Sequence, residues 1–428
     1  MSITSGYSST SAVPPRTPDR HRRPRLAALT CGLPAKTPRA ILGAVMTVEP
    51  ANCFEVGVIG AGPAGCAAAL AAAQAGHSVV LLEQARLPRY KTCGGGVLAR
   101  AFDLLPPGAA GIVERSFESV ALNFLGTGMN FVATRPAPMV HMTMRSELDY
   151  FLARQAQNAG VQLVDSCAVN GLSLKADRVE IFSARGRYIT KFVIAADGVH
   201  SRIARAAGWP DLPVLAPALE HELWLSPEDF ARFGQRPRFD FNGIEAGYAW
   251  VFPKRAHLSV GIMSTRRVCP DLTAKLAAYL RNIGIARSER VERHGYLIPL
   301  APRPGPLARG RVLLVGDAAG LADPVTAEGI FHALLSGQLA AAALTQGRGE
   351  PATVAASYQS LLEHRILAEL RAARFLARIL YRHPHLRHAA FRLGGPKLCD
   401  FAVRVVLGQA SYRSALRRPA SYIKWLGR

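Results

Sequence analysis

The sequence predicts an α/β fold in which segments far apart along the chain contribute to one open parallel sheet. Two short apolar runs, at 55–60 and 311–316, each lead directly into a glycine-rich turn. Short apolar runs bounded by turn signals are typical of buried parallel strands. After about residue 208 the pattern changes to short alternating runs, which are typical of an antiparallel sheet. These observations predict a discontinuous, Rossmann-like α/β domain, a separate antiparallel sheet and a helical C-terminal region.

The first turn reads Gly60-Ala-Gly62-Pro-Ala64-Gly65 and precedes an alanine-rich helix expected over 66–75. Strand, glycine turn and helix in this order form a dinucleotide-binding fingerprint. The glycines permit a tight turn, a close approach to pyrophosphate and close packing of the helix on the strand. The helix N-terminus offers N–H groups and a positive dipole to the phosphates.

An acidic residue follows at the position where such a fingerprint needs one. The next expected strand, 78–83, ends in Glu83, which lies 18 residues after Gly65. A carboxylate at this distance is typical of a ribose ligand, so Glu83 is expected to bind the adenosine ribose. The alternative is a glycine-rich turn without a ligand.

The second turn distinguishes FAD from NAD. Gly316-Asp317 lies at the carboxyl end of its expected strand, where ligands bind in an open α/β sheet. The Asp317 carboxylate can accept hydrogen bonds from ribityl hydroxyls, which NAD lacks. A small-residue helix then begins near Gly329 and Ile330 and runs through Ala343. Its first N–H groups are expected to stabilise negative charge on a reduced flavin ring.

Six motifs follow one another along the chain: GAGPAG at 60–65, PRYKTCGGG at 88–96, Arg145 with Asp149, IAADG at 194–198, GYAWVFPK at 247–254 and GDAAGLADPVTAEGI at 316–330. In this ordered set the chain resembles the geranylgeranyl reductase family of flavoproteins, which are similar in fold to p-hydroxybenzoate hydroxylase. The resemblance covers roughly 56–343. The Trp-x-Trp-x-Ile-Pro run of flavin halogenases is absent.

The resemblance implies further site residues. Arg145, Asp197 and Gly198 are expected near FAD, with the turn at Asp197 supporting pyrophosphate and meeting a nicotinamide cofactor. Cys93 is expected beside the isoalloxazine, in proton delivery or redox control. Its alternative role is that of a small packing residue.

Tyr248 and Trp250 are expected to share one face of a strand, together with Phe252. They are candidates for the catalytic pocket that holds a prenyl chain. The alternative is that they form ordinary sheet core.

The resemblance implies a reductase that saturates isolated C=C bonds of a polyprenyl chain by hydride transfer from reduced FAD. One alternative is an FAD-dependent aromatic monooxygenase that uses oxygen. Another is a non-enzymatic prenyl-lipid carrier. No second GxGxxG motif is present, so the electron donor is expected to be transiently bound NAD(P)H or ferredoxin.

The expected organisation is a discontinuous FAD-binding domain with an antiparallel substrate domain and a helical tail. Its parts are a disordered basic extension at 1–50, an FAD-binding domain at 52–205 and 305–347 with inserted strands near 115–140, a substrate domain at 206–304 and a basic helical region at 348–428. Seven cysteines without Cys-x-x-Cys spacing argue against a disulfide framework and structural zinc. No metal is expected, and the expected location is the cytoplasm.

Two long apolar segments, 56–82 and 329–347, are expected to be buried α/β elements rather than membrane spans.

The formal net charge of +22 is concentrated in the tails. Residues 1–45 are a targeting segment or the product of an upstream start codon, since Met46 precedes the first strand.

The C-terminal charge follows a helical order over 363–383. Apolar residues are expected on one side, and Arg371, Arg374, Arg378 and Arg382 on the other. This helix is either an ordinary cap or a peripheral contact with an anionic membrane surface. Nucleic acid is not an expected partner, because the tails carry few aromatic residues and no recognised motif.

Overall fold

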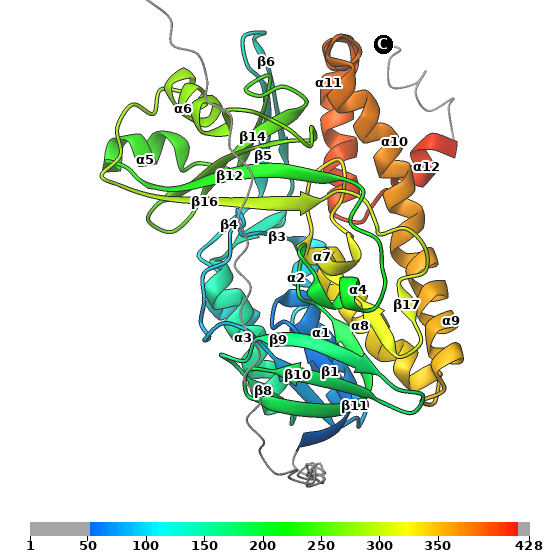
Figure 1. The fold of residues 1–428 in the computed structure, drawn as a ribbon. Helices are drawn as coiled ribbons and strands as arrows, with labels where there is room; N and C mark the ends of the chain where they lie inside the picture. The colour runs from blue at the N-terminus through cyan, green and yellow to red at the C-terminus, as the bar shows by residue number, and fades with distance from the viewer. Residues whose placement is uncertain (1–51, 418–428) are drawn as a thin grey trace, which may run out of the picture. The chain divides into compact units, whose positions relative to one another are not determined.

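The computed structural model describes residues 52–417 (Figure 1), so the predicted extension at 1–50 lies outside the described residues. The predicted α/β fold is confirmed. The first sheet is mainly parallel and has the order β17-β18-β11-β1-β2-β8, with β10 and β9 joined to β11. Its strands are β1 (Cys53–Ile59), β2 (Val79–Leu82), β8 (Gln162–Val164), β9 (Val169–Leu174), β10 (Val179–Ser183), β11 (Gly186–Ala195), β17 (Ala308–Arg309) and β18 (Val312–Leu314).

This sheet is covered by helices, as a parallel sheet requires. The segment 56–82 forms β1, α1 (Pro63–Gln74) and β2, which confirms that it is a buried α/β element. Small residues let α1 pack closely on α8 (Ile330–Gln346), since a Cβ at Gly337 would lie 2.3 Å from the Ala64 carbonyl oxygen. None of the helices within 52–417 is both long enough and apolar enough to cross a bilayer.

The second sheet has seven strands in the order β16-β12-β15-β14-β13-β5-β6. The antiparallel strands expected after residue 208 are confirmed as β12 to β15. The strands of the expected insertion, β5 and β6, belong to this sheet too, because β5 pairs in parallel with β13. The seven strands are β5 (Ser119–Phe124), β6 (Met129–Thr134), β12 (Leu215–Trp224), β13 (Arg238–Phe241), β14 (Gly247–Pro253), β15 (Leu258–Ser264) and β16 (Arg290–Pro299).

A small third sheet and several helices complete the region between the two larger sheets. The third sheet has the order β3-β7-β4, from β3 (Gly96–Leu98), β7 (Val140–Met142) and β4 (Arg115–Phe117). The helices are α2 (Ala99–Phe102), α3 (Arg145–Asn158), α4 (Arg202–Ala206), α5 (Pro227–Phe233), α6 (Leu272–Asn282) and α7 (Gly316–Ala319), with a short 3-10 helix at Ala109–Ile112.

The C-terminal region is helical, and Figure 1 shows α10 and α11 running side by side past the second sheet. The predicted amphipathic order is confirmed: Ile366, Leu370 and Ala373 are buried, whereas Arg371 and Arg378 are exposed. The single helix expected over 363–383 is corrected to a π-helical turn followed by α10. The elements are α9 (Pro351–Leu362), the π-helix (Glu363–Leu367), α10 (Ala368–Arg382), α11 (Pro384–Val406) and α12 (Tyr412–Arg417).

Candidate active site

One cavity of about 1140 Å³ joins the carboxyl ends of the parallel strands to the second sheet and the C-terminal helices. At one end it is lined by the glycine turn after β1. At the other it is lined by aromatic side chains of β13 and β14 and by apolar residues of α10 and α11. Single small-ligand pockets usually enclose roughly 300–1000 Å³, so this volume suits a cofactor together with part of a substrate.

The glycine turn fixes the start of α1. Gly60 has φ of +103°, and a Cβ there would lie 2.4 Å from the Ala196 carbonyl oxygen. A Cβ at Gly65 would lie 1.8 Å from the Gly60 carbonyl oxygen. By contrast, a Cβ at Gly62 would meet only an Arg145 nitrogen, at 3.9 Å, so the backbone at Gly62 is open to the cavity. Gly60 and Gly65 therefore admit only glycine, as the fingerprint predicts for the tight turn and for close helix packing.

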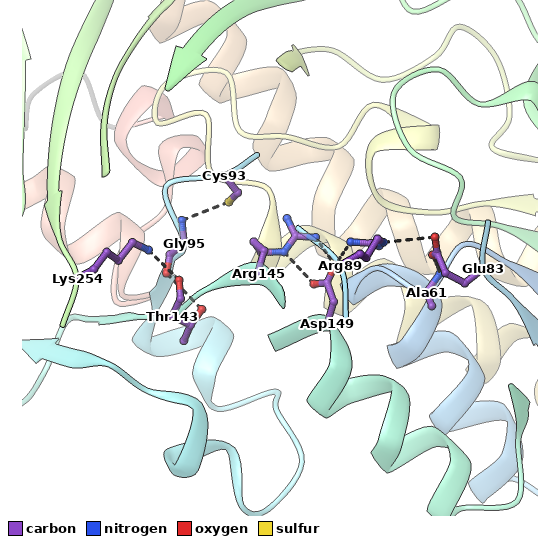
Figure 2. A network of polar contacts seen from close by, with 9 residues as sticks. All are labelled: Ala61, Glu83, Arg89, Cys93, Gly95, Thr143, Arg145, Asp149 and Lys254. Carbon is purple, nitrogen blue, oxygen red and sulfur yellow. Dashed lines mark hydrogen bonds and ion pairs between the residues drawn. The ribbon is translucent and has the colours of Figure 1, made fainter. Parts of the chain in front are cut away.

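Glu83 directly follows β2, lines the cavity and belongs to a charged network (Figure 2). Its carboxylate accepts a hydrogen bond of 2.7 Å from the Ala61 N–H and contacts Arg89 Nε at 3.3 Å. Arg89 also donates to Asp149 at 2.9 Å, and Arg145 donates two further bonds to Asp149, at 2.8 and 2.9 Å. The network therefore holds Glu83 and Arg145 at the cavity wall.

Arg145 is the first residue of α3. Burial alone would lower the pKa of its guanidinium, but the ion pair with Asp149 and the contact with Cys93 raise it, so the side chain stays positively charged. A buried cation at this position suits an anionic or electron-rich ligand.

Asp197 and Gly198 follow β11 and line the cavity. The Asp197 carboxylate accepts bonds from Ser201 Oγ at 2.5 Å and from the Ile203 N–H at 3.1 Å. Both carboxylate oxygens therefore stabilise the start of α4, which fixes the turn. Gly198 has φ of +80°, a conformation that favours glycine.

Asp317 lies in the first turn of α7, directly after β18. Tyr296 donates a hydrogen bond of 3.3 Å to its carboxylate, and Lys91 Nζ lies 3.0 Å from the centre of the Tyr296 ring. Burial raises the pKa of Asp317, and the charges of Lys91 and Arg145 oppose that shift. Burial and Arg145 lower the pKa of Lys91 to about 8. Asp317 and Lys91 thus form a polar part of the cavity lining.

Gly329 and Ile330 line the cavity at the start of α8. The N–H of Phe331, in the first turn, donates to the Glu328 side chain at 2.6 Å. Arg100 lies 3.7 Å from the same carboxylate. Part of the helix N-terminus expected to face a flavin ring is therefore occupied by Glu328.

Cys93 lies on the loop between β2 and β3, and this loop lines the middle of the cavity. Its sulfur accepts a hydrogen bond of 3.4 Å from the Gly95 N–H and contacts Arg145 (Figure 2). Lys254, which follows β14, is fully buried and donates to the carbonyl oxygens of Gly94 at 2.7 Å and Thr143 at 2.8 Å. An ammonium from the second sheet therefore anchors the Cys93 loop.

Tyr248 and Trp250 face the cavity from β14. Their ring centroids lie 6.3 Å apart, and Trp250 lies 6.3 Å from Phe252, which confirms that the three share one face. The Tyr248 hydroxyl donates to the Thr326 carbonyl oxygen at 2.6 Å. This bond leaves an apolar ring surface toward the cavity, so Tyr248 acts there as a wall.

The residues present fit FAD. The N-terminus of α1 has no side-chain cap, so its free N–H groups remain available to a pyrophosphate at Gly62. Glu83 and Asp317 place carboxylates at two separate points of the same cavity, as a ribose and a ribityl chain require. Within 52–417 no group of His, Cys, Asp and Glu side chains has the arrangement of a metal site.

The structure brings most of the predicted residues to the cavity surface. Gly65 and Gly316 do not line it; both lie behind it, where a Cβ at Gly316 would come within 2.9 Å of the Ala64 Cβ. The sequence reasoning missed Glu220 of β12 as a lining residue and Lys254 as an anchor. The predicted residues that line the cavity are Gly60, Gly62, Ala64, Glu83, Cys93, Arg145, Asp197, Gly198, Tyr248, Trp250, Asp317, Gly329 and Ile330.

Comparison with known proteins agrees with this geometry. Residues 53–219 match the family model described as an FAD binding domain. The chain is 32% identical over 362 residues to digeranylgeranylglycerophospholipid reductase 1 of Methanopyrus kandleri, covering 76% of this chain and 90% of that protein. It is 31% identical to the chloroplastic geranylgeranyl diphosphate reductase of Oryza sativa subsp. japonica, covering 69% of this chain and 67% of that protein.

Two solved structures share the fold. A geranylgeranyl bacteriochlorophyll reductase-like protein of Thermoplasma acidophilum matches with a TM-score of 0.68 at 21% identity, over 88% of this chain and 97% of that one. A flavin-dependent brominase matches with a TM-score of 0.67 at 18% identity, over 87% of this chain and 98% of that one. The structural likeness extends across different flavin chemistries, whereas the sequence likeness is to the reductases. The chain belongs to the geranylgeranyl reductase family of FAD-binding oxidoreductases.

Proposed function

We propose that the protein is an FAD-dependent reductase that saturates C=C bonds in a polyprenyl, geranylgeranyl-type chain. The observation that carries the proposal is the continuity of one cavity from the glycine turn, past Cys93, to an apolar wall. Its far end is lined mainly by apolar residues, among them Leu122, Phe239, Leu380, Phe391 and Leu398, and Arg387 is a charged residue in the same lining. A prenyl chain is apolar along its whole length, so such a lining favours its burial.

We assign the residues along this cavity to different parts of FAD. We assign the adenosine ribose to Glu83, the pyrophosphate to the turn at Gly60 and Gly62 with support from Asp197, and the ribityl chain to Asp317. When bound and reduced, FAD supplies a hydride. The protein then has to orient the alkene, exclude water and supply a proton. We assign contact with the ring to Cys93 and Arg145, which both line the cavity.

The relatives guide the choice of substrate class. The two named above are reductases of a geranylgeranyl diphosphate and of a digeranylgeranyl glycerophospholipid, and a further relative, at 28% identity, is a menaquinone reductase of Mycolicibacterium smegmatis. These substrates share a polyprenyl chain and differ in their headgroups. We therefore assign the chain, and not a headgroup, as the part that this protein recognises. The electron donor in this proposal is NAD(P)H or ferredoxin.

The test is anaerobic turnover with a defined reductant. Purified protein containing FAD is reduced with dithionite and incubated with a panel of polyprenyl alcohols, diphosphates, phospholipids and quinones. Mass spectrometry is expected to detect the added mass of two hydrogens for each reduced double bond. Samples without protein, and samples with protein but without dithionite, are the controls.

The same assay separates the alternatives. A prenyl-lipid carrier would bind members of the panel without changing their mass. A monooxygenase would leave the panel unchanged without oxygen and would consume oxygen with an aromatic substrate. Either result contradicts the reductase proposal.

We also propose that the C-terminal helices contact an anionic membrane surface, from a protein that is otherwise cytoplasmic. On α10, Phe375 is 51% exposed and Ile379 is 38% exposed, on the side that carries Arg378. On α11, Leu386 is 60% exposed, and both Ile379 and Leu386 also line the cavity. Exposed apolar residues beside arginines are typical of helices that lie in a lipid headgroup region. A substrate chain would then enter the cavity directly from the bilayer.

Vesicle flotation tests this contact. The protein is expected to float with vesicles containing phosphatidylglycerol and not with pure phosphatidylcholine vesicles. A Phe375→Asp, Leu386→Asp variant is expected to lose flotation, whereas Phe182→Asp, which changes an exposed aromatic residue on β10, is expected to retain it. Equal flotation of all three proteins would contradict the proposal.

A further inference from the structure

Two buried carboxylates lie under the Cys93 loop and belong to none of the cofactor motifs. Glu220 and Glu222 occupy alternate positions of β12, so they lie on the same face of the strand. Each is only 1% exposed. Glu220 lines the cavity, in the region of Cys93 and Trp250. Burying a carboxylate is costly unless it is paired, so its partners decide what it does.

The Glu220 carboxyl group is only partly satisfied. Ser259 Oγ donates to its Oε1 at 2.5 Å, and the backbone N–H of Cys93 also donates to the group. Its Oε2 is buried and has no hydrogen-bond partner among the described residues. Lys254 is the nearby cation, but its ammonium is engaged by two carbonyl oxygens, and within 52–417 no basic group forms an ion pair with Glu220.

Groups from each neighbouring element affect the charge of Glu220. On its own strand, Glu222 lies beside it and pairs with His257, which follows β14, at 3.1 Å. The Cys93 loop contributes Tyr90, whose hydroxyl donates to Glu222 at 3.4 Å. On β16, His294 is opposite Glu220 in the strand register and stacks on Tyr90 at 4.0 Å.

The balance of these contacts makes Glu220 easier to protonate than an ordinary glutamate. Burial and the charge of Glu222 raise the pKa of Glu220 to about 7, against the opposing effects of Ser259, Lys254 and the Cys93 N–H. A group with this pKa holds a proton in about half of the molecules at neutral pH, which suits a general acid.

Glu328 is the competing carboxyl group in the same cavity. Its Oε2 also lacks a hydrogen-bond partner among the described residues, and burial raises its pKa. However, Arg100 lies 3.7 Å away and the Phe331 N–H donates to the other oxygen. A cation and a helix N-terminus both stabilise the charged form. The geometry therefore favours Glu220 over Glu328 as the group that gives up a proton.

We propose that Glu220 is the proton donor to the prenyl double bond, an inference that rests on the proposed reductase function. One alkene carbon receives the hydride from the reduced cofactor, and the π bond breaks. The second carbon receives the proton from the Glu220 O–H bond, which leaves a carboxylate. A proton from water then restores the acid. Glu222 and His257 act as positioning residues, because they set the charge beside Glu220 without reaching the substrate.

A half-reaction experiment separates this role from cofactor binding. Protein with bound FAD is reduced anaerobically with dithionite, then mixed with a polyprenyl lipid that the wild type reduces, and reoxidation is followed by flavin absorbance. In Glu220→Gln, FAD binding and reduction by dithionite are expected to be retained. Reoxidation by the lipid is expected to slow by about 10²–10⁴-fold, the usual contribution of a general acid.

Matched variants identify which carboxyl group matters. Glu180→Gln changes another buried glutamate, which is on β10 and pairs with Arg187, and it is expected to reoxidise at the wild-type rate. Glu328→Gln is expected to keep most of the rate. Glu220→Asp retains the acid at a longer distance and is expected to recover part of the loss. Circular dichroism and thermal unfolding confirm that each variant folds.

The pH dependence gives a readout that a structural role would not change. The wild-type rate of reoxidation by lipid is expected to fall as the pH rises through about 7, because Glu220 loses its proton. Glu222→Gln removes a negative neighbour, which lowers the pKa of Glu220 and moves this fall to lower pH. Without any substrate, infrared difference spectroscopy is expected to detect a protonated carboxyl group at neutral pH that is missing in Glu220→Gln.

The outcomes distinguish a failure of the reductase function from a failure of the role of Glu220. If no polyprenyl lipid reoxidises the reduced wild type, the reductase function and the role of Glu220 both fall. If the wild type is reoxidised and Glu220→Gln matches it, only the role of Glu220 is overturned. A rate lost in Glu328→Gln and retained in Glu220→Gln would transfer that role to Glu328.

Discussion

The two ends of the cavity are built in different ways. At the cofactor end, the shape is set by backbone: glycines at positions such as Gly60 and Gly65 leave no room for a side chain. At the end that we propose for the substrate, the shape is set by side chains: Phe239, Tyr248 and Trp250 line the cavity from β13 and β14 at ring distances of 5.6 to 6.3 Å. A cavity surface formed by backbone atoms keeps its shape when side chains are substituted, whereas a surface formed by side chains changes its shape with each substitution.

This difference indicates which part of the cavity can change its ligand specificity by substitution. Substitutions on the aromatic face alter the volume and polarity of the substrate end without moving a backbone atom of the glycine turn. The fold is shared with a reductase-like protein and with a brominase, and one fold can serve different functions. Lys254 connects the two ends of the cavity, since it extends from the second sheet to the carbonyl oxygens of Gly94 and Thr143.

The largest effect is expected at the cofactor end. In Gly65→Val, the new side chain would collide with the Gly60 carbonyl oxygen, so the turn would have to open. We expect the affinity for FAD to fall on the order of a thousandfold, equivalent to about 4 kcal/mol. The measurement is the flavin absorbance that remains with the purified protein, followed by titration with FAD.

Gly171→Ala is the matched control, because a Cβ there would meet nothing within 4 Å and its φ is not in the left-handed region. It is expected to bind FAD as the wild type does. A Gly65→Val protein that folds and retains the yellow cofactor would show that the glycine turn does not shape the FAD site.

The second effect is expected where the two ends are connected. Lys254→Met leaves the buried carbonyl oxygens of Gly94 and Thr143 without their donor, which costs about 1–3 kcal/mol for each unsatisfied group. For the two groups together, we expect the free energy of unfolding to fall by roughly 2–6 kcal/mol. Chemical denaturation with and without FAD measures this loss.

Lys191→Met provides the comparison, because Lys191 is 60% exposed and forms a surface ion pair with Glu55. Its effect is expected to stay within about 0.5 kcal/mol. If the two variants unfold alike, Lys254 does not connect the sheet to the loop.

Much of the cofactor end could be predicted from the sequence, because its signals are local. A buried strand, a glycine turn and a helix follow one another within 53–74, and Glu83 directly follows the next strand. The aromatic face of β14 could be predicted too, since alternation along one strand is a local pattern. Each of these features depends on residues close together in the chain.

Glu220 and Lys254 could not be predicted, because their environments depend on distant segments. Glu220 and Glu222 alternate with Leu219, His221 and Leu223, a pattern that normally indicates a solvent-exposed polar face. In the structure, the loop at 90–96 covers that face and buries both carboxylates. The available signal was the occurrence of two glutamates at alternate positions in a mainly apolar strand.

The smallest effect is expected on the aromatic wall, and it tests the comparison most directly. Trp250→Leu removes a ring that lines the cavity from β14. Aromatic contacts contribute about 0.5–1.5 kcal/mol beyond burial, so we expect the Kd of a polyprenyl lipid to rise by roughly 2–10-fold. FAD affinity is expected to stay unchanged, because no backbone at the glycine turn moves. Titration of the lipid into the oxidised holoprotein, followed by the change in flavin absorbance, measures the first effect.

The control for this last variant is Phe182→Leu, which changes a 42% exposed aromatic residue on β10 and should alter neither affinity. The informative contrast is between the two ligands of one variant. A Trp250→Leu protein that binds lipid normally but loses FAD would mean that the aromatic wall supports the cofactor, and the division between a backbone end and a side-chain end would then be wrong. Loss of lipid affinity with FAD retained would place the determinants of chain recognition on β14.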